Sequence, residues 1–136
     1  MTTIFILYTG GLHSECTHNQ SGTVITTDAP LDNHGTGASF SPTDLLCNAL
    51  ATCMISIIGI ASKTHDFDVV GTKMEVTKIM ESNPRKVGEI IVEIFFPEQN
   101  YSDKTKAIIE KSALTCPVYL SLHPDVKKTV HFHYKS

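Results

Sequence analysis

The chain has 136 residues, of which 41% are hydrophobic and 18% are charged, and its formal net charge is −3. This length fits a single domain, residues 1–136, and the composition supports a buried core and excludes a disordered chain. Acidic and basic residues are scattered without a basic stripe, which argues against a nucleic-acid-binding protein. No run of about 18 consecutive apolar residues predicts a membrane span.

The first apolar run, residues 4–8, has no preceding basic residue and no cleavage site of small residues. It is therefore typical of a buried strand rather than of a signal peptide. We expect a cytoplasmic protein, and structural disulfides are rare in that compartment. The four cysteines must then be core filler, metal ligands or reactive thiols.

The N-terminal third predicts three strands, at about 3–9, 13–18 and 23–27, with a turn at Ser21-Gly22. Residues 28–40 then form a polar loop of a length that is often functional.

A long helix follows, and its start is marked clearly. Ser41 can cap the helix, Pro42 suits its first turn, and Asp44 completes a capping box. From Leu45 to Ala61 apolar residues recur every three or four positions, which predicts one buried stripe. A sheet or a partner subunit must cover a helix this apolar.

The second half predicts strands at about 68–80 and 87–96, joined by a turn at 82–84. Ser102 can cap a helix ending near Leu114, Cys116-Pro117 opens a short helical turn, and residues 129–134 alternate as a last strand. The order βββ-α-ββ-α-α-β predicts an α+β fold with a largely antiparallel sheet.

Two cysteines stand out by position. Cys53 lies on the apolar stripe of the long helix, where a thiol is either a small buried hydrophobe or a reactive group. Cys116 precedes Pro117 at a helix start, where the amides are expected to lower a thiol pKa, unless the residue serves only as a cap. Cys47 points to a different side of the helix from Cys53.

Histidines offer weaker candidates. Cys16 and His18 share one strand face, as do His131 and His133, but neither spacing matches a known zinc motif, and we predict no metal. His34, in the loop, is expected to be exposed to solvent.

Asp44 lies nine residues, or about 14 Å, before Cys53 on the same predicted helix. No carboxylate side chain spans that distance. An acid that acts on Cys53 from this position must therefore come from another subunit.

Residues 40–46 (FSPTDLL) and 49–54 (ALATCM) resemble the central helix of the OsmC/Ohr family. Residues 83–94 resemble the family's entry into its second sheet, and residues 116–118 (CPV) resemble its second-cysteine motif. The opening of the chain is similar to one OsmC-like branch, so the resemblance covers nearly the whole sequence.

The resemblance implies antiparallel sheets around a long central helix, in an intertwined homodimer with sites at the subunit interface. It also implies a thiol-dependent reductase of organic or inorganic hydroperoxides. Cys53 attacks the peroxide and becomes a sulfenic acid, Cys116 condenses with it to a disulfide, and an external thiol or lipoyl group reduces that disulfide. No cofactor is implied.

The family's peroxidases activate the first thiol with an arginine and a carboxylate. Here Thr43 holds the usual carboxylate position, and Asp44 comes next. The only arginine is Arg85, and His13 stands where relatives of this branch have an arginine. The resemblance thus makes Asp44 and His13 candidates for activation.

Two other readings stay open. The chain could be a non-enzymatic or weakly active OsmC-like module that binds a small hydrophobic or thiol ligand at the dimer interface. It could also exchange disulfides with a protein partner.

Overall fold

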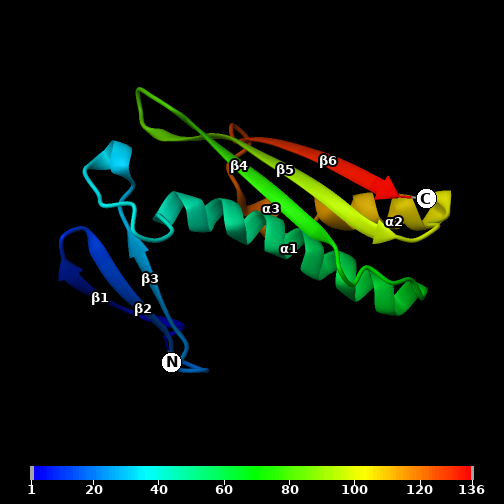
Figure 1. Cartoon of the computed structure of the whole chain (residues 1–136), viewed down its shortest axis with the longest axis horizontal. Helices are drawn as coiled ribbons and strands as arrows, with labels where there is room; N and C mark the ends of the chain where they lie inside the picture. The colour runs from blue at the N-terminus through cyan, green and yellow to red at the C-terminus, as the bar shows by residue number, and fades with distance from the viewer. Residues whose placement is uncertain (1, 136) are drawn as a thin grey trace. The chain divides into compact units, whose positions relative to one another are not determined.

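The computed structural model describes residues 2–135 (Figure 1), which divide into a first compact unit up to Leu46 and a second from Cys47 onward. That the whole chain forms one domain stays a prediction. The elements are β1 (Ile4–Gly10), β2 (His13–His18), β3 (Val24–Asp28), η1 (Leu31–Asn33), α1 (Pro42–His65), β4 (Lys73–Glu81), β5 (Lys86–Glu98), α2 (Asp103–Leu114), α3 (Pro117–Ser121) and β6 (Lys127–Lys135). The chain is therefore α+β, as predicted.

The first unit contains an antiparallel sheet in the order β1-β2-β3. The predicted strands and the turn at 21–22 are confirmed, but the expected burial of the first strand is not. All five side chains from Ile4 to Tyr8 are between 53% and 61% exposed in the single chain. Neighbouring residues of a strand point to opposite faces, so both faces of this sheet present apolar groups to solvent.

The loop after β3 contains the 3₁₀ turn η1, which is followed by His34 in the left-handed region at φ 67°. Gly35 then approaches Ala29 closely, since a Cβ at position 35 would lie 1.7 Å from the Ala29 carbonyl oxygen. His34 is exposed, as predicted.

The start of α1 has the predicted capping box. The backbone N–H of Asp44 donates to Ser41 Oγ at 3.0 Å, and the Asp44 carboxylate accepts from the Ser41 N–H at 3.0 Å. These two bonds satisfy amide groups that a helix start leaves without intrahelical partners.

Helix α1 is also long and apolar enough to span a membrane, with a mean hydropathy of 2.0 over its best 18-residue window. Polar residues interrupt the apolar run, which is why a count of consecutive apolar residues did not detect it. Core helices of soluble proteins have the same property, and the absence of a membrane span stays a prediction. Only 28% of this window is buried in the single chain.

The second unit holds a sheet in the order β4-β5-β6. Strands β4 and β5 pair antiparallel, as expected for a hairpin, but β5 and β6 pair parallel. The prediction of a largely antiparallel sheet did not include this parallel pair. The long connection through α2 and α3 explains it, because parallel strands require such a crossover.

Strand β4 begins at Lys73, five residues later than predicted. The Asp68 carboxylate accepts from the Val70 N–H at 2.9 Å, and Gly71 adopts φ +92°. This turn chemistry prevents an extended start to the strand.

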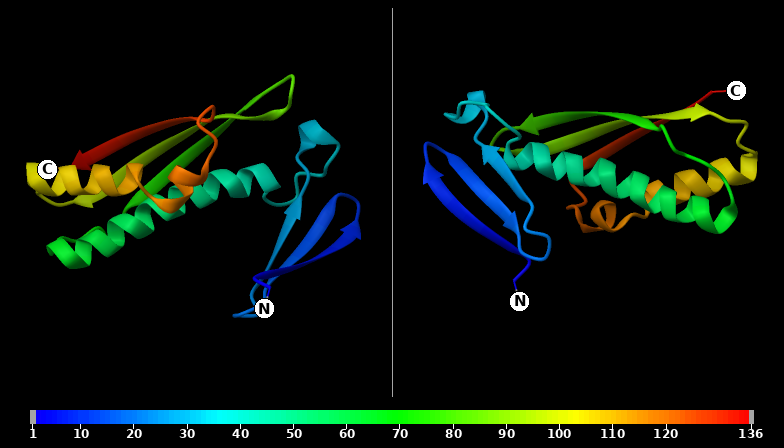
Figure 2. Two further views of the ribbon diagram at one scale, coloured as in Figure 1. Left: turned by 180° about the vertical axis from the view of Figure 1, so that it is seen from behind. Right: turned by 60° about the horizontal axis from the view of Figure 1, so that its bottom comes forward.

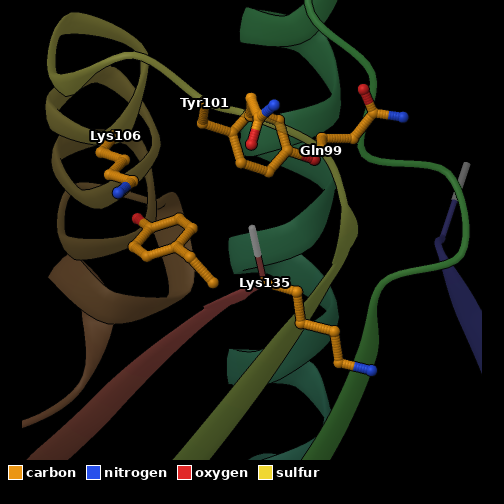
Figure 3. Close-up of a pocket in the computed structure, with 6 residues that line it drawn as sticks. Gln99, Tyr101, Lys106 and Lys135 are labelled. Atoms are coloured by element: carbon orange, nitrogen blue, oxygen red, sulfur yellow. The ribbon is translucent and has the colours of Figure 1, made fainter.

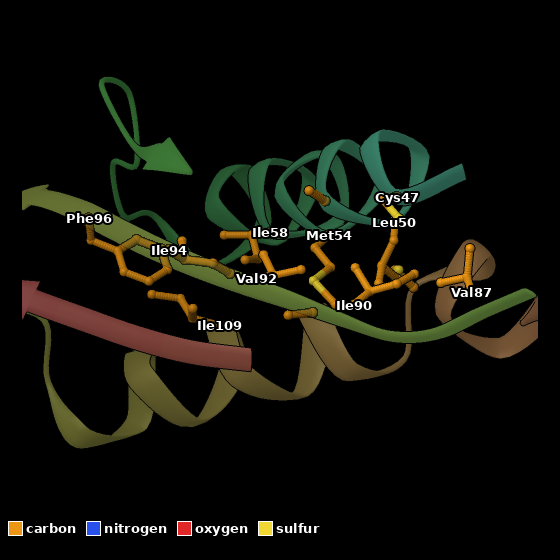
Figure 4. Packing of buried hydrophobic residues seen from close by; sticks show 13 residues of the cluster. Cys47, Leu50, Met54, Ile58, Val87, Ile90, Val92, Ile94, Phe96 and Ile109 are labelled. Atoms are coloured by element: carbon orange, nitrogen blue, oxygen red, sulfur yellow. The ribbon is translucent and has the colours of Figure 1, made fainter. Parts of the chain in front are cut away.

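The core lies between α1, α2 and β5, and the helices cover one face of the β4-β5-β6 sheet (Figures 2 and 4). Alternate residues of β5, from Ile90 to Phe96, point into it. The buried hydrophobic residues are Cys47, Leu50, Ala51, Met54, Ile58, Val87, Ile90, Val92, Ile94, Phe96, Ile109, Ala113 and Cys116.

Candidate thiol site

Cys53 lies in the middle of α1, half-buried at the edge of the hydrophobic core. Neighbouring positions of the helix, such as Leu50 and Met54, are fully buried. The helix thus fixes the thiol between the core and the surface.

Cys116 is the N-cap residue of α3, and Pro117 occupies the first helical position, as predicted. Its Sγ accepts the Tyr119 N–H at 3.4 Å. Unlike Cys53, Cys116 is completely buried. Its sulfur therefore accepts a hydrogen bond as a helix cap although its surroundings are apolar.

The two side chains lie within range of a direct interaction, because Cys53 shifts the pKa of the Cys116 thiol. Burial raises the pKa of the Cys116 thiol above 9.0, the Tyr119 N–H lowers it by a smaller amount, and Cys53 raises it further. The predicted lowering of this pKa is therefore wrong. The helix amides do stabilise the thiolate, but loss of hydration outweighs them, and Cys116 stays a neutral thiol near pH 7.

The other two cysteines are elsewhere. Cys47 is buried in the core on a different side of α1, as predicted. Cys16 is half-buried on β2, where it lines a small apolar hollow with His18. All four cysteines are free thiols.

His13 belongs to the first unit and is held by an acid. Its Nδ1 lies 2.9 Å from the carboxylate of Asp28, which is only 4% exposed. The two residues are cross-strand partners on β2 and β3. The carboxylate fixes the tautomer and orientation of the imidazole, in a pairing that acid–base sites use.

Sequence reasoning missed Asp28, because the predicted turn at 21–22 would place residue 30 opposite residue 13. The loop instead spans residues 19–22, since the His18 N–H donates to the Thr23 carbonyl, and this register pairs residue 13 with residue 28.

Asp44 is committed to the capping box of its own helix. Nine residues of continuous α1 separate it from Cys53, as the sequence predicted. Within one chain it therefore has a structural role at the helix start.

The histidines of β6 form ion pairs with a glutamate. His133 Nε2 and His131 Nε2 lie 2.7 Å and 3.7 Å from the two carboxylate oxygens of Glu93. Within residues 2–135 no group of three metal-ligating side chains has a geometry suited to a metal ion.

A polar hollow of about 140 Å³ lies beside the start of α2 and the end of β6, and residues 99–101, Lys106 and Tyr134 line it (Figure 3). The hydroxyls of Tyr101 and Tyr134 donate to the Asp68 carbonyl and the Glu110 carboxylate. Burial raises the pKa of both tyrosines. They stay protonated, so this hollow offers no nucleophile comparable to the thiol pair.

Comparisons with known proteins bear on the family and the fold of the chain. The model of the family described as OsmC-like protein matches residues 35–131. A search of curated proteins gave no match. Among solved structures, a Psychrobacter arcticus 273-4 protein assigned to the osmotic stress induced and detoxification response is 48% identical, with a TM-score of 0.93 over 98% of this chain and 96% of that one.

More distant structures share the fold. An organic hydroperoxide resistance protein OsmC from Legionella pneumophila is 15% identical, with a TM-score of 0.76 over 98% of both chains. A Vibrio cholerae organic hydroperoxide resistance protein, solved with captopril in one active site, is 10% identical with a TM-score of 0.73 over 97% of this chain and 92% of that one. On the family match and the 48% identity, the chain belongs to the OsmC-like family.

Proposed function

We propose that this protein is a thiol-dependent hydroperoxide reductase in which Cys53 is the peroxidatic thiol and Cys116 the resolving thiol. The observation that carries the proposal is the contact between these two side chains, which come from α1 and from the start of α3. The names of two structural neighbours, both organic hydroperoxide resistance proteins, support the same chemistry.

In the first step the Cys53 thiolate attacks the distal peroxide oxygen and the O–O bond breaks. The thiol becomes a sulfenic acid, and the alkoxide leaves as an alcohol after taking up the thiol's proton. In the second step Cys116 displaces the sulfenic hydroxyl, which leaves as water, and a disulfide forms. Two equivalents of an external thiol, or one dihydrolipoyl group, return both cysteines to the reduced state and are themselves oxidised.

The contact between the thiols also favours the reaction of Cys53 before that of Cys116. While Cys53 is reduced, burial and Cys53 itself keep Cys116 protonated and therefore weakly nucleophilic. Oxidation of Cys53 removes the second of these influences. Cys116 then ionises more easily, at the stage when it must attack.

We further propose that the active form is a homodimer in the reducing cytoplasm. The exposed apolar strand β1 and the largely exposed apolar window of α1 support this, because apolar patches of such size usually mark interfaces. His13, oriented by Asp28, and Asp44 are the candidate activating groups.

Activity is tested by turnover of cumene hydroperoxide and hydrogen peroxide with dithiothreitol or lipoamide as reductant. We expect Cys53→Ser to abolish turnover. Cys116→Ser should still allow sulfenic acid formation, which a dimedone adduct detects by mass spectrometry. Cys16→Ser is the control for loss of a thiol, because Cys16 is half-buried on β2 and lies outside the core that holds Cys116.

After one equivalent of peroxide, non-reduced peptide mapping should show a disulfide between Cys53 and Cys116. Full turnover by Cys53→Ser would overturn the proposal. Absence of turnover by the wild-type protein with all four pairs of substrate and reductant would favour a ligand-binding module instead.

The role of His13 is tested separately. Peroxide turnover and iodoacetamide alkylation of Cys53 between pH 5 and 9 should differ among the wild type, His13→Arg and His13→Ala. Three identical profiles would show that His13 serves only as a strand residue.

A further inference from the structure

Lys128 occupies a position of β6 where an apolar side chain is expected. It pairs in register with Ile90 of β5, which is fully buried. Strand residues two positions apart share a face, and the next residues on this face of β6, which are Val130, Phe132 and Tyr134, pack against the core. Lys128 itself is half-buried. A charged group in such a place is unfavourable unless its ammonium has suitable partners.

The Lys128 ammonium finds its partners in the segment that begins at α3. Its Nζ donates to the Val126 carbonyl at 2.8 Å and, more weakly, to the His123 carbonyl at 3.5 Å. The same Nζ lies 5.2 Å from the ring centroid of Tyr119, within the range of an attractive cation–π contact. Lys128 therefore ties α3 and the loop after it to β6.

Tyr119 connects this lysine to the thiol pair. Tyr119 is half-buried and packs against the core, and its N–H donates to Cys116 Sγ at 3.4 Å. Helix α3 has only five residues, which are too few for a stable helix by themselves, so contacts with the rest of the unit must hold it. The direction of the Cys116 sulfur therefore depends on where Lys128 holds Tyr119.

That direction matters for the second step of the proposed reaction. A disulfide needs its two Cα atoms within about 7 Å and a narrow range of torsions, and a small misplacement of the attacking atom slows the reaction. We propose that Lys128 is a positioning residue, which holds Tyr119 and thereby aims Cys116 Sγ at the sulfenic acid of Cys53.

In this step the S–S bond forms, the S–O bond of the sulfenic acid breaks, and the hydroxyl leaves as water with the proton of the Cys116 thiol. Lys128 takes no part in these bond changes. The inference rests on the proposed function, because it concerns the resolving step of that reaction.

The test follows both steps in the reduced full-length protein after one equivalent of cumene hydroperoxide. A dimedone adduct on Cys53 reports the sulfenic acid, and non-reduced peptide mapping of quenched samples reports the disulfide. We expect Lys128→Met to form the sulfenic acid at the wild-type rate but the disulfide about two- to fivefold more slowly, the rate equivalent of one cation–π contact. Lys128→Arg should restore the rate, because it keeps the charge. Lys127→Met is the matched control, because Lys127 is 74% exposed and points to the other face of β6.

A double-mutant cycle shows whether the effect passes through Tyr119. Tyr119→Leu keeps an apolar side chain but removes the ring, so it should slow disulfide formation by a similar factor, and adding Lys128→Met should slow it no further. Additive effects, or equal disulfide rates in the wild type and Lys128→Met, would overturn the inference. An equal slowing of both steps would also contradict it, because a general loss of structure would then explain the effect.

Hydrogen exchange at the Tyr119 amide gives a readout that does not depend on turnover. Exchange should be faster in Lys128→Met than in the wild type and Lys127→Met, while the amides of β5 keep their wild-type rates. The same Tyr119 rate in all three proteins would rule out the positioning role. Absence of any sulfenic acid in the wild type is a distinct result, because it contradicts the proposed function while the exchange rates still decide whether Lys128 holds α3.

Discussion

The two units differ in how far they bury their apolar side chains. The second unit buries thirteen hydrophobic residues between α1, α2 and its sheet, whereas the first unit buries none among the residues the structure describes. The buried residues of the first unit are instead polar, Asp28 and Ser41. One region has its own core, while the other is specified by hydrogen bonds and presents apolar groups on both faces of its sheet.

The difference means that the second unit holds the thiol pair in place, whereas the first unit offers a surface for assembly. The scaffold of Cys53 and Cys116 depends on packing inside the second unit. The exposed strand β1 gains little by burial within the single chain, so its apolar sequence is explained best by a surface that another molecule covers.

The largest expected effect comes from removing matched phenylalanines from the two regions. Phe96 is 1% exposed and stacks on Tyr134 at 5.0 Å between ring centroids, whereas Phe5 is 61% exposed. Phe96→Ala should lower the free energy of unfolding by about 3–5 kcal/mol because it leaves a core cavity. Phe5→Ala should cost much less at low protein concentration in a urea titration. Equal costs for the two variants would remove the contrast between the regions.

A second test places a charge on each face of β1. Phe5 and Ile6 point to opposite faces, and burial of one such side chain contributes about 1.5–3 kcal/mol. At least one of Phe5→Glu and Ile6→Glu should therefore raise the dimer dissociation constant about tenfold or more, as measured by light scattering over a dilution series. Thr77→Glu, at an exposed position of β4, adds the same charge and is the control. A dimer unaffected by both β1 variants would contradict the proposed interface.

A third test compares acid–histidine pairs. Asp28 is buried beside His13, whereas Glu93 is more exposed beside His133. Asp28→Asn should cost about 1–3 kcal/mol, because the hydrogen bond to His13 loses its buried, charged acceptor, and Glu93→Gln should cost about 0–1 kcal/mol. Chemical denaturation at pH 7 gives both values. A larger loss for Glu93→Gln would show that burial does not set the strength of these pairs.

The smallest effect is a loss of stability in alkali. The folded-state pKa of Cys116 is raised above 9.0, so the folded chain holds this proton more tightly than the unfolded chain does. The stabilisation is complete below pH 9 and is lost as the pH rises through the folded-state pKa. Unfolding of the wild type and Cys116→Ala should show a steeper alkaline decline for the wild type. Parallel curves would show that the thiol titrates alike in both states.

Local signals predicted much of this fold. The caps at Ser41, Ser102 and Cys116 each depend on residues within three positions, and all three are present. The long helix and the hairpins follow from periodicity and turn residues, which also act over short distances.

The predictions that failed concern features that depend on residues far apart in the sequence. The parallel pairing of β6 with β5 depends on the path of a 28-residue connection, which periodicity does not encode. The pKa of Cys116 was predicted from its helix amides alone, but burial under the core decides its direction.

Because Cys116 is a helix cap, its substitution by serine and its substitution by alanine should have different effects on α3. Serine is among the best N-cap residues, so Cys116→Ser keeps an acceptor for the Tyr119 N–H while removing the sulfur chemistry. Cys116→Ala removes both. Hydrogen exchange at the Tyr119 amide should therefore be slow in the serine variant and fast in the alanine variant, although neither can form the disulfide. Oxidation of the native residue turns the neutral Cys116 thiol into a disulfide sulfur, so the exchange rate of the Tyr119 amide also reports whether disulfide formation keeps or breaks this cap.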